Sequence, residues 1–140
     1  MSHRRLKRKK SEGAVLVELA LSLMVMILLC FGAMEYGWMF YRLQQVTNVA
    51  QAGARQGVLP DATNDDVTTT VANLMTAHGL ADTGYTVTIT PGDVTAVDPG
   101  DLITVRLDVP YGAEAGLLQM GIFPTPSNLP CSVAMAKEGP

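Results

Sequence analysis

The sequence predicts an α+β protein, in which a long N-terminal membrane-spanning helix extends into a small extracytoplasmic domain with a short helix and an antiparallel sheet of about three strands. Three observations predict this class. Residues 14–41 are an apolar run with only two charged residues, helical periodicity then continues to about residue 56, and two later stretches alternate apolar and polar side chains. A chain of 140 residues has room for one membrane helix and one small domain.

The charge is divided unevenly along the chain. Residues 1–13 form a basic leader with six Lys or Arg and one acid, a net charge of +5, whereas residues 14–140 carry four Lys or Arg and twelve acids, a net charge of −8. By the positive-inside rule, this asymmetry places the N-terminus in the cytoplasm and the later residues across the membrane. The acidic outer portion argues against nucleic-acid binding.

The apolar run is long enough to cross a bilayer. Its 28 residues, 14–41, would rise about 42 Å as a helix, compared with roughly 30 Å of hydrocarbon. A secretory signal has a shorter apolar region that ends in a small-x-small cleavage site, and no convincing site follows Cys30. We therefore expect the transmembrane helix to stay in the mature protein, with membrane lipid as one of its partners.

Residues 42–57 continue the same helix outside the membrane. Apolar residues recur there at spacings of three and four, and Gly57 followed by Pro60 ends the helix. This stretch is rich in small residues, among them Gly53 and Gly57, which allow a close approach to the backbone. Two interpretations stay open: the glycines accommodate another molecule, or they accommodate the chain's own domain.

Residues 58–140 are expected to form the small α+β domain. Asn64 is a candidate N-cap, an apolar stripe follows, and Gly79 ends the helix. Residues 85–90 and 102–111 alternate strictly and are joined by turn-forming residues, which predicts an antiparallel hairpin. The segment CSVAMAKE supplies a third strand, and residues 112–130 are either a helix or an ordered loop.

We find no catalytic, cofactor-binding or metal-binding constellation. The two histidines and two cysteines form no cluster, and we expect Cys30 and Cys131 to be buried as small apolar side chains. Asp93, Asp98 and Asp101 lack the spacing of a calcium loop. The sequence thus predicts a protein that is not an enzyme and has no cofactor.

Two acids in the apolar run need a reason, because a carboxylate in lipid is costly. Glu35 lies among aromatic residues, where its carboxylate can reach headgroup water. Glu18 lies one helical turn after Ala14. A cut between Gly13 and Ala14 would create an α-amino group that Glu18 could pair with, in its own chain or in a neighbour. Alternatively, Glu18 reaches the inner interface without a partner.

Several of these residues together resemble a known family. The basic leader, the glycine and an apolar helix with an acid at its fifth position resemble the class III signal of type IV prepilins, which a membrane prepilin peptidase cuts. The segments VELAL, FGAMEYG and NVAQAGARQG resemble TadE-like pseudopilins of the Tad/Flp tight-adherence pilus system. Matched residue by residue, Gly13 and Ala14 flank the cut and Glu18 is the assembly acid. The helix motifs fall on Gly32, Glu35, Gly37, Ala50, Gly53, Ala54 and Arg55.

The resemblance implies a pilin-like fold and a minor pilin or pseudopilin that takes part in assembly of a pilus for adherence or secretion. Its implied partners are the prepilin peptidase, other pilins and the inner-membrane assembly platform. It also implies a single-pass protein of the bacterial inner membrane with a cytoplasmic N-terminus. Two departures are Met24, where relatives often carry proline, and Leu19, where they often carry an aromatic residue. The alternative is an uncut, membrane-anchored scaffold protein of a pilus or secretion assembly.

Overall fold

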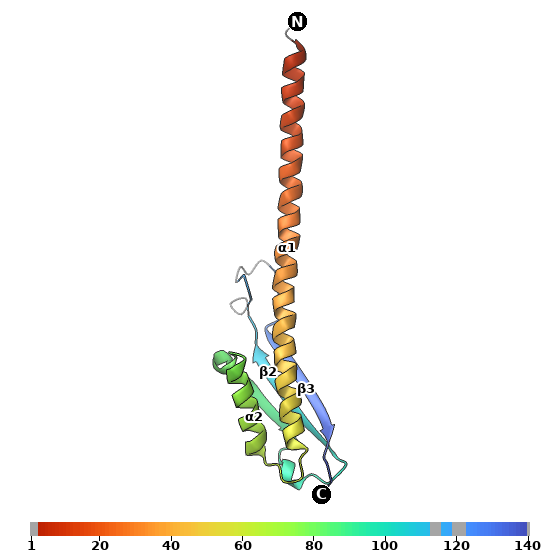
Figure 1. The fold of residues 1–140 in the computed structure, drawn as a ribbon, viewed down its shortest axis with the longest axis vertical. Helices are drawn as coiled ribbons and strands as arrows, with labels where there is room; N and C mark the ends of the chain where they lie inside the picture. Colours follow the sequence, from red (N-terminus) through yellow and green to blue (C-terminus); the bar gives the residue numbers. More distant parts are fainter. Residues whose placement is uncertain (1–2, 113–115, 119–122, 140) are drawn as a thin grey trace.

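One helix extends far beyond the rest of the molecule (Figure 1). The computed structural model describes residues 3–112, 116–118 and 123–139, with side chains from residue 13 onward. Helix α1 spans His3–Gly57 without interruption, and its C-terminal part carries the folded domain. The helix therefore begins within the basic leader and not at Ala14, because the leader is rich in Lys and Arg, which are good helix formers.

Helix α2, Asn64–Ala77, packs beside α1 and begins one residue earlier than expected. Its N-cap is Thr63, which accepts a bond from the backbone N–H of Asp66 while the Asp66 carboxylate accepts one from the Thr63 N–H. Asn64 is not the cap. Its side chain instead bonds to Gly92 and Val94, which fastens the start of α2 to the loop after the first strand. Gly79 ends this region with a φ of +67°.

The three predicted strands form one antiparallel sheet in the order β1-β2-β3. Strand β1 is Thr86–Thr90, β2 is Leu102–Pro110 and β3 is Asn128–Ala136. Two short 3₁₀ helices, η1 (Ala81–Thr83) and η2 (Val94–Ala96), precede β1 and β2 respectively. The fold class is thus confirmed, including the hairpin and its third strand.

The sheet has one buried and one solvent-exposed face. Helices α1 and α2 lie on the same side of it (Figure 1). The exposed face carries polar side chains, as in the adjacent row Thr88, Arg106 and Ser132. This arrangement explains the alternation seen in the sequence, because an antiparallel sheet covered on one side needs apolar residues at every second position only.

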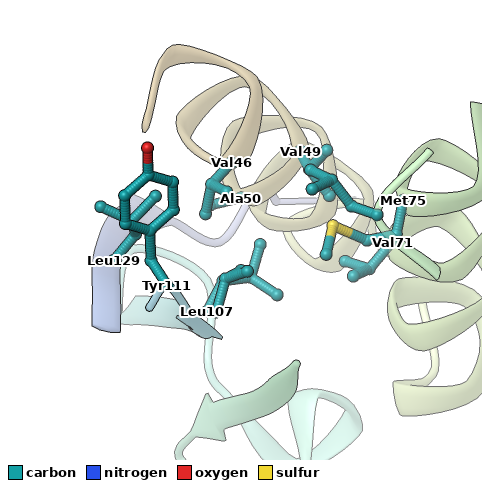
Figure 2. Close-up of a cluster of buried hydrophobic side chains, with 10 residues drawn as sticks. Val46, Val49, Ala50, Val71, Met75, Leu107, Tyr111 and Leu129 are labelled. Atoms are coloured by element: carbon teal, nitrogen blue, oxygen red, sulfur yellow. The ribbon is translucent and has the colours of Figure 1, made fainter. Parts of the chain in front are cut away.

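The core lies between the upper half of α1, helix α2 and the inner face of the sheet. Figure 2 shows side chains from all three elements converging. The labelled residues are Val46, Val49, Ala50, Val71, Met75, Leu107, Tyr111 and Leu129. Only the part of α1 beyond about residue 39 contributes to this core. The domain therefore packs against the C-terminal part of the helix alone.

The two glycines near the end of α1 serve the chain's own packing. A Cβ on Gly53 would lie 2.8 Å from Val71 Cγ2, and one on Gly57 would lie 3.2 Å from Val67 Cγ2. Both valines belong to α2, so these glycines let α2 approach the α1 backbone closely. Of the two interpretations left open by the sequence, the intramolecular one accounts for Gly53 and Gly57.

The segment between β2 and β3 is described only in part. Gly112, residues 116–118 and residues 123–127 form neither helix nor strand, so the described part is an ordered loop rather than a helix. The question of how residues 113–115 and 119–122 fold lies outside the described residues. The described loop residues nevertheless contact α1, and these contacts lie at the level where the predicted site residues are found.

Candidate functional site

The exposed portion of α1 is the most unusual surface of the molecule. Every residue from 14 to 31 is exposed, and the side chains there are almost all apolar. Within the described residues, α1 is the one helix long and apolar enough to cross a membrane, and its most apolar stretch is not buried by the domain. A soluble protein rarely exposes so much apolar surface, so this geometry fits a single-pass membrane protein.

The predicted processing site lies at the start of this exposed portion. Gly13 is helical, and a Cβ there would meet nothing within 4 Å. Ala14 and Glu18 are both exposed and are one turn apart, so they share a face of the helix. The structure thus places these residues together on an unobstructed helix, while the cut and the role of Glu18 stay predictions.

The middle motif lies where the loop between β2 and β3 contacts α1. The Phe123 ring packs against Gly32, with its Cε1 only 3.1 Å from where a Cβ would be. Glu35 is 5% exposed, and its Oε2 accepts a hydrogen bond from the Leu118 backbone N–H at 2.9 Å. Gly32 has no side chain and so leaves room for the Phe123 ring, while the Glu35 carboxylate accepts a charge-assisted hydrogen bond from the loop backbone. Both residues therefore hold the loop on the helix.

Glu35 does not behave as the sequence suggested. We expected its carboxylate to reach headgroup water, but it is buried and its partner is a backbone N–H. Its neighbour Tyr36 donates a hydrogen bond from its hydroxyl to the Pro124 carbonyl at 3.2 Å, and the Tyr36 and Phe123 rings meet edge to face with centroids 6.5 Å apart. Sequence reasoning missed Phe123 and Leu118 because they lie in a stretch without periodicity.

Gly37, the last residue of the middle motif, has a different environment. A Cβ there would meet nothing within 4 Å, and the residue is exposed. Gly37 therefore points away from the loop that Gly32 and Glu35 hold. The three motif residues do not form one site within the chain.

The last motif belongs mainly to the core. Ala50, Gly53 and Ala54 are buried against α2 and the sheet, whereas Arg55 is exposed. Its small residues are explained by close packing between α1, α2 and β2.

A cavity of about 360 Å³ lies beside the loop, between α1 and the end of β2. Its walls include Trp38, Arg42 and Tyr111. The Arg42 guanidinium lies 4.8 Å from the Trp38 ring centroid and donates to the His78 carbonyl at 3.4 Å. The Tyr111 hydroxyl is buried and has no hydrogen-bond partner among the described residues. Among the described residues that line the cavity, no nucleophile is paired with a base.

Charge around this cavity affects Tyr111. Burial raises the pKa of the Tyr111 phenol, and the negative charge of Glu35 raises it further, while Arg42 partly opposes the shift. The phenol therefore stays neutral across the physiological pH range.

No metal site was found in the part of the chain that the structure describes, where no three His, Cys, Asp or Glu side chains gather. Both cysteines are free. Cys131 is half-buried, and its thiol lies 3.6 Å from the Thr47 hydroxyl. Cys30 is exposed on the apolar part of α1, so our expectation of burial within the protein was wrong for it. No other described element packs against residues 14–31 of α1, so nothing covers the Cys30 side chain.

The comparison with protein families matches the region that contains these motifs. Residues 13–55 match the family model described as "TadE-like protein". The match confirms the resemblance inferred from the sequence, and it runs from the predicted processing site almost to the end of α1. No curated protein and no solved structure matches the chain.

Proposed function

We propose that this chain, whose residues 13–55 match the TadE-like family model, is a minor pilin or pseudopilin of a Tad/Flp-type pilus system. In this proposal, a prepilin peptidase cuts the chain after Gly13, and the product takes part in assembling a pilus for adherence or secretion. The observation that supports it most is the division of α1 into an exposed apolar half and a half that carries the domain. A subunit with this shape can pass from lipid to a helical stack without refolding.

The proposed topology follows from the charge distribution. Six of the ten Lys and Arg residues precede the apolar stretch, and an acidic domain follows it. Basic residues next to a membrane helix stay in the cytoplasm. We therefore propose that the protein lies in the bacterial inner membrane with its N-terminus in the cytoplasm and its domain outside.

Glu18 is the proposed assembly residue. Cleavage after Gly13 would leave an ammonium group on Ala14, one turn from the Glu18 carboxylate, on a helix with no covering element. Both charges would be at the edge of lipid, where an unpaired charge is costly. In a stack of helices, the carboxylate of one subunit could pair with the ammonium of the next and so set the axial register.

The proposed partners are those that this pathway requires: the prepilin peptidase, other pilins and the inner-membrane assembly platform. The TadE-like family is not an enzyme family, and no nucleophile is paired with a base among the described residues that line the cavity beside Tyr111. Assembly, rather than chemistry, is the function that this exposed helix supports.

The decisive experiment is the N-terminal sequence and intact mass of the full-length protein, isolated from cells with and without a prepilin peptidase. We expect a chain that begins at Ala14 when the peptidase is present and at Met1 when it is absent. A Gly13→Leu variant is the matched control, since it blocks the cut while keeping an apolar helical residue. A chain that begins at Met1 in every strain would refute processing and favour the alternative, an uncut scaffold protein.

A further inference from the structure

We propose that the loop residues Leu117 and Phe123 rest on the lipid surface, in the leaflet next to the folded domain. In this role they act as a membrane-contacting foot, which we define as residues 116–118 and 123–124. The foot would set the depth at which α1 is inserted in the bilayer. It requires only that α1 crosses a membrane, so it does not depend on processing or on pilus assembly.

The height of the foot along α1 is the first argument. Residues 14–31 are all exposed, and as a helix they rise about 27 Å, close to the roughly 30 Å of bilayer hydrocarbon. Gly32 is the next residue, and it is the first that the domain buries. The foot contacts α1 at Gly32, Glu35 and Tyr36, so it lies where the hydrocarbon ends.

The attachment of the foot to α1 is the second argument. Among the described residues, the contacts that hold it include the Phe123 ring on Gly32 and on the Tyr36 ring, the bond from the Leu118 N–H to the Glu35 carboxylate, and the bond from the Tyr36 hydroxyl to the Pro124 carbonyl. The bond to Leu118 gives the Glu35 carboxylate, which is buried between α1 and the loop, a hydrogen-bond partner. A buried carboxylate without a hydrogen bond is costly, so the foot and Glu35 stabilise each other.

The chemistry of the foot identifies lipid as its occupant. Leu117 is 47% exposed at the cavity that Trp38 and Tyr111 line, while the Tyr36 and Phe123 rings lie beside Gly32. Tyr and Trp gather at the membrane–water boundary because each has an apolar ring and a polar O–H or N–H, and Tyr36 has both. The Phe123 ring adds apolar surface beside it. The foot continues the lipid-facing surface of α1 sideways, along the plane of the membrane.

A foot at Gly32 moves the outer end of the membrane-spanning part of α1 toward the N-terminus, compared with the prediction from the sequence. We expected the membrane-spanning part to extend to Tyr41, but a foot at Gly32 places the end of the hydrocarbon about nine residues earlier, which is about 14 Å along the helix axis. The stretch from Gly32 to Tyr41 would then lie in the headgroup layer and beyond. It carries Trp38 and Tyr41, whose rings lie 5.5 Å apart and suit that layer.

Fluorescence quenching by brominated lipids tests the foot directly. Trp38 is the only tryptophan, so a Trp38→Phe background removes the native signal. Leu117→Trp in this background, reconstituted as the full chain in phosphatidylcholine vesicles brominated near the carbonyl end of the acyl chains, places an indole at the foot. Because interfacial apolar groups sit about 5–10 Å into the headgroup and acyl boundary, we expect the emission at position 117 to shift to the blue and to fall at least about twofold.

Leu102→Trp is the matched control. Leu102 is also an exposed leucine, 61% exposed, but it begins β2 at the end of the domain far from the foot (Figure 1). An indole at position 102 should emit as in water and show no quenching. Equal quenching at positions 117 and 102, or none at position 117, would overturn the proposal. Quenching or a blue shift that appears only at high protein density would assign the surface to a second copy of the chain and would likewise overturn it.

A second variant separates the role of Glu35 from mere folding. Glu35→Ala removes the acceptor for the Leu118 N–H, and we expect it to weaken quenching at position 117 while the circular dichroism of the domain stays unchanged. Glu35→Gln keeps a side-chain oxygen that can accept the bond, so quenching should be largely restored. Unchanged quenching in Glu35→Ala would show that the carboxylate does not position the foot.

Discussion

At the scale of the residue, similar side chains in this chain have opposite environments. Glu18 is exposed on the apolar helix, whereas Glu35 is buried and bonded to a backbone N–H. Gly37 faces open space, whereas Gly53 is pressed against Val71. The identity of a residue in a helix motif therefore does not give its role, because the role depends on what packs against that face.

The glycines allow a matched test of packing. A methyl group on Gly53 would lie 2.8 Å from Val71 Cγ2, and valine in a helix has little freedom to move aside. We expect Gly53→Ala to lower the free energy of unfolding by about 1–3 kcal/mol, as overpacking typically does. Gly37→Ala, with nothing within 4 Å, should not lower it. Urea unfolding in detergent measures both, and equal midpoints would contradict this account of Gly53.

The N-cap of α2 predicts a dependence on pH. Hydrogen bonds from Thr63 lower the pKa of Asp66 below its ordinary value of 3.8. Because the folded-state pKa is the lower one, the contribution of Asp66 to stability is fully present above pH 3.8 and is lost as the pH falls through the lowered pKa. Asp66→Asn should therefore destabilise the domain more near neutral pH than at about pH 2.

Asp65→Asn is the control for this effect. It removes a negative charge from the same first turn of α2 but leaves the reciprocal bonds between Thr63 and Asp66 intact. Urea midpoints measured at both pH values should show a smaller loss for Asp65→Asn. A loss in Asp66→Asn that persists unchanged in acid would indicate a cause other than the ionised carboxylate.

At the scale of the element, hydrogen bonds of Lys137 and Glu138 connect three segments that are separate in the sequence. The Lys137 side chain is buried and donates to the Val94 carbonyl. The backbone of Lys137 bonds to Gly100 and Asp101, and the Glu138 N–H bonds to the Val58 carbonyl at 2.9 Å. The residues after β3 thus connect the loop before β2 to the end of α1, beside the buried cluster of Val58, Val94, Val97 and Ile103.

Truncation tests this fastening. Deletion of residues 137–140 removes these bonds and leaves the buried Val94 carbonyl without its partner, which costs about 1–3 kcal/mol. We expect a lower thermal midpoint and faster proteolysis of the loop at residues 91–101. Deletion of residues 139–140 alone keeps Lys137 and Glu138 and should leave both measurements unchanged. Equal behaviour of the two truncations would contradict a stabilising role for Lys137 and Glu138.

At the scale of the whole molecule, one helix carries two surfaces with different purposes. The part of α1 beyond about residue 39 is a wall of the domain's core, and residues 14–31 are exposed and almost all apolar. The domain therefore does not depend on the exposed part for its core. That independence would let the exposed part exchange lipid for other helices.

Substitution of Glu18 tests the proposed assembly role. If Glu18 pairs with the ammonium of a neighbouring subunit, Glu18→Ala leaves that buried charge unpaired, which typically costs about 3–5 kcal/mol. We expect the protein to insert into the membrane normally but its recovery in sheared pili to fall at least about tenfold. Met24→Leu, an apolar change on the same exposed stretch, is the control. Normal recovery of Glu18→Ala would favour a simple anchor.

The sequence by itself determined the long helix, the short helix and the three strands, because each depends on local periodicity and on caps. It also determined the TadE-like resemblance of residues 13–55, since those motifs are local too. Only the tertiary structure decided that Glu35 bonds to Leu118, that Phe123 covers Gly32, and that Gly53 and Gly57 serve α2. These contacts join residues far apart in the chain through a loop without a repeating pattern, and such contacts depend on how the packed elements meet rather than on any local signal.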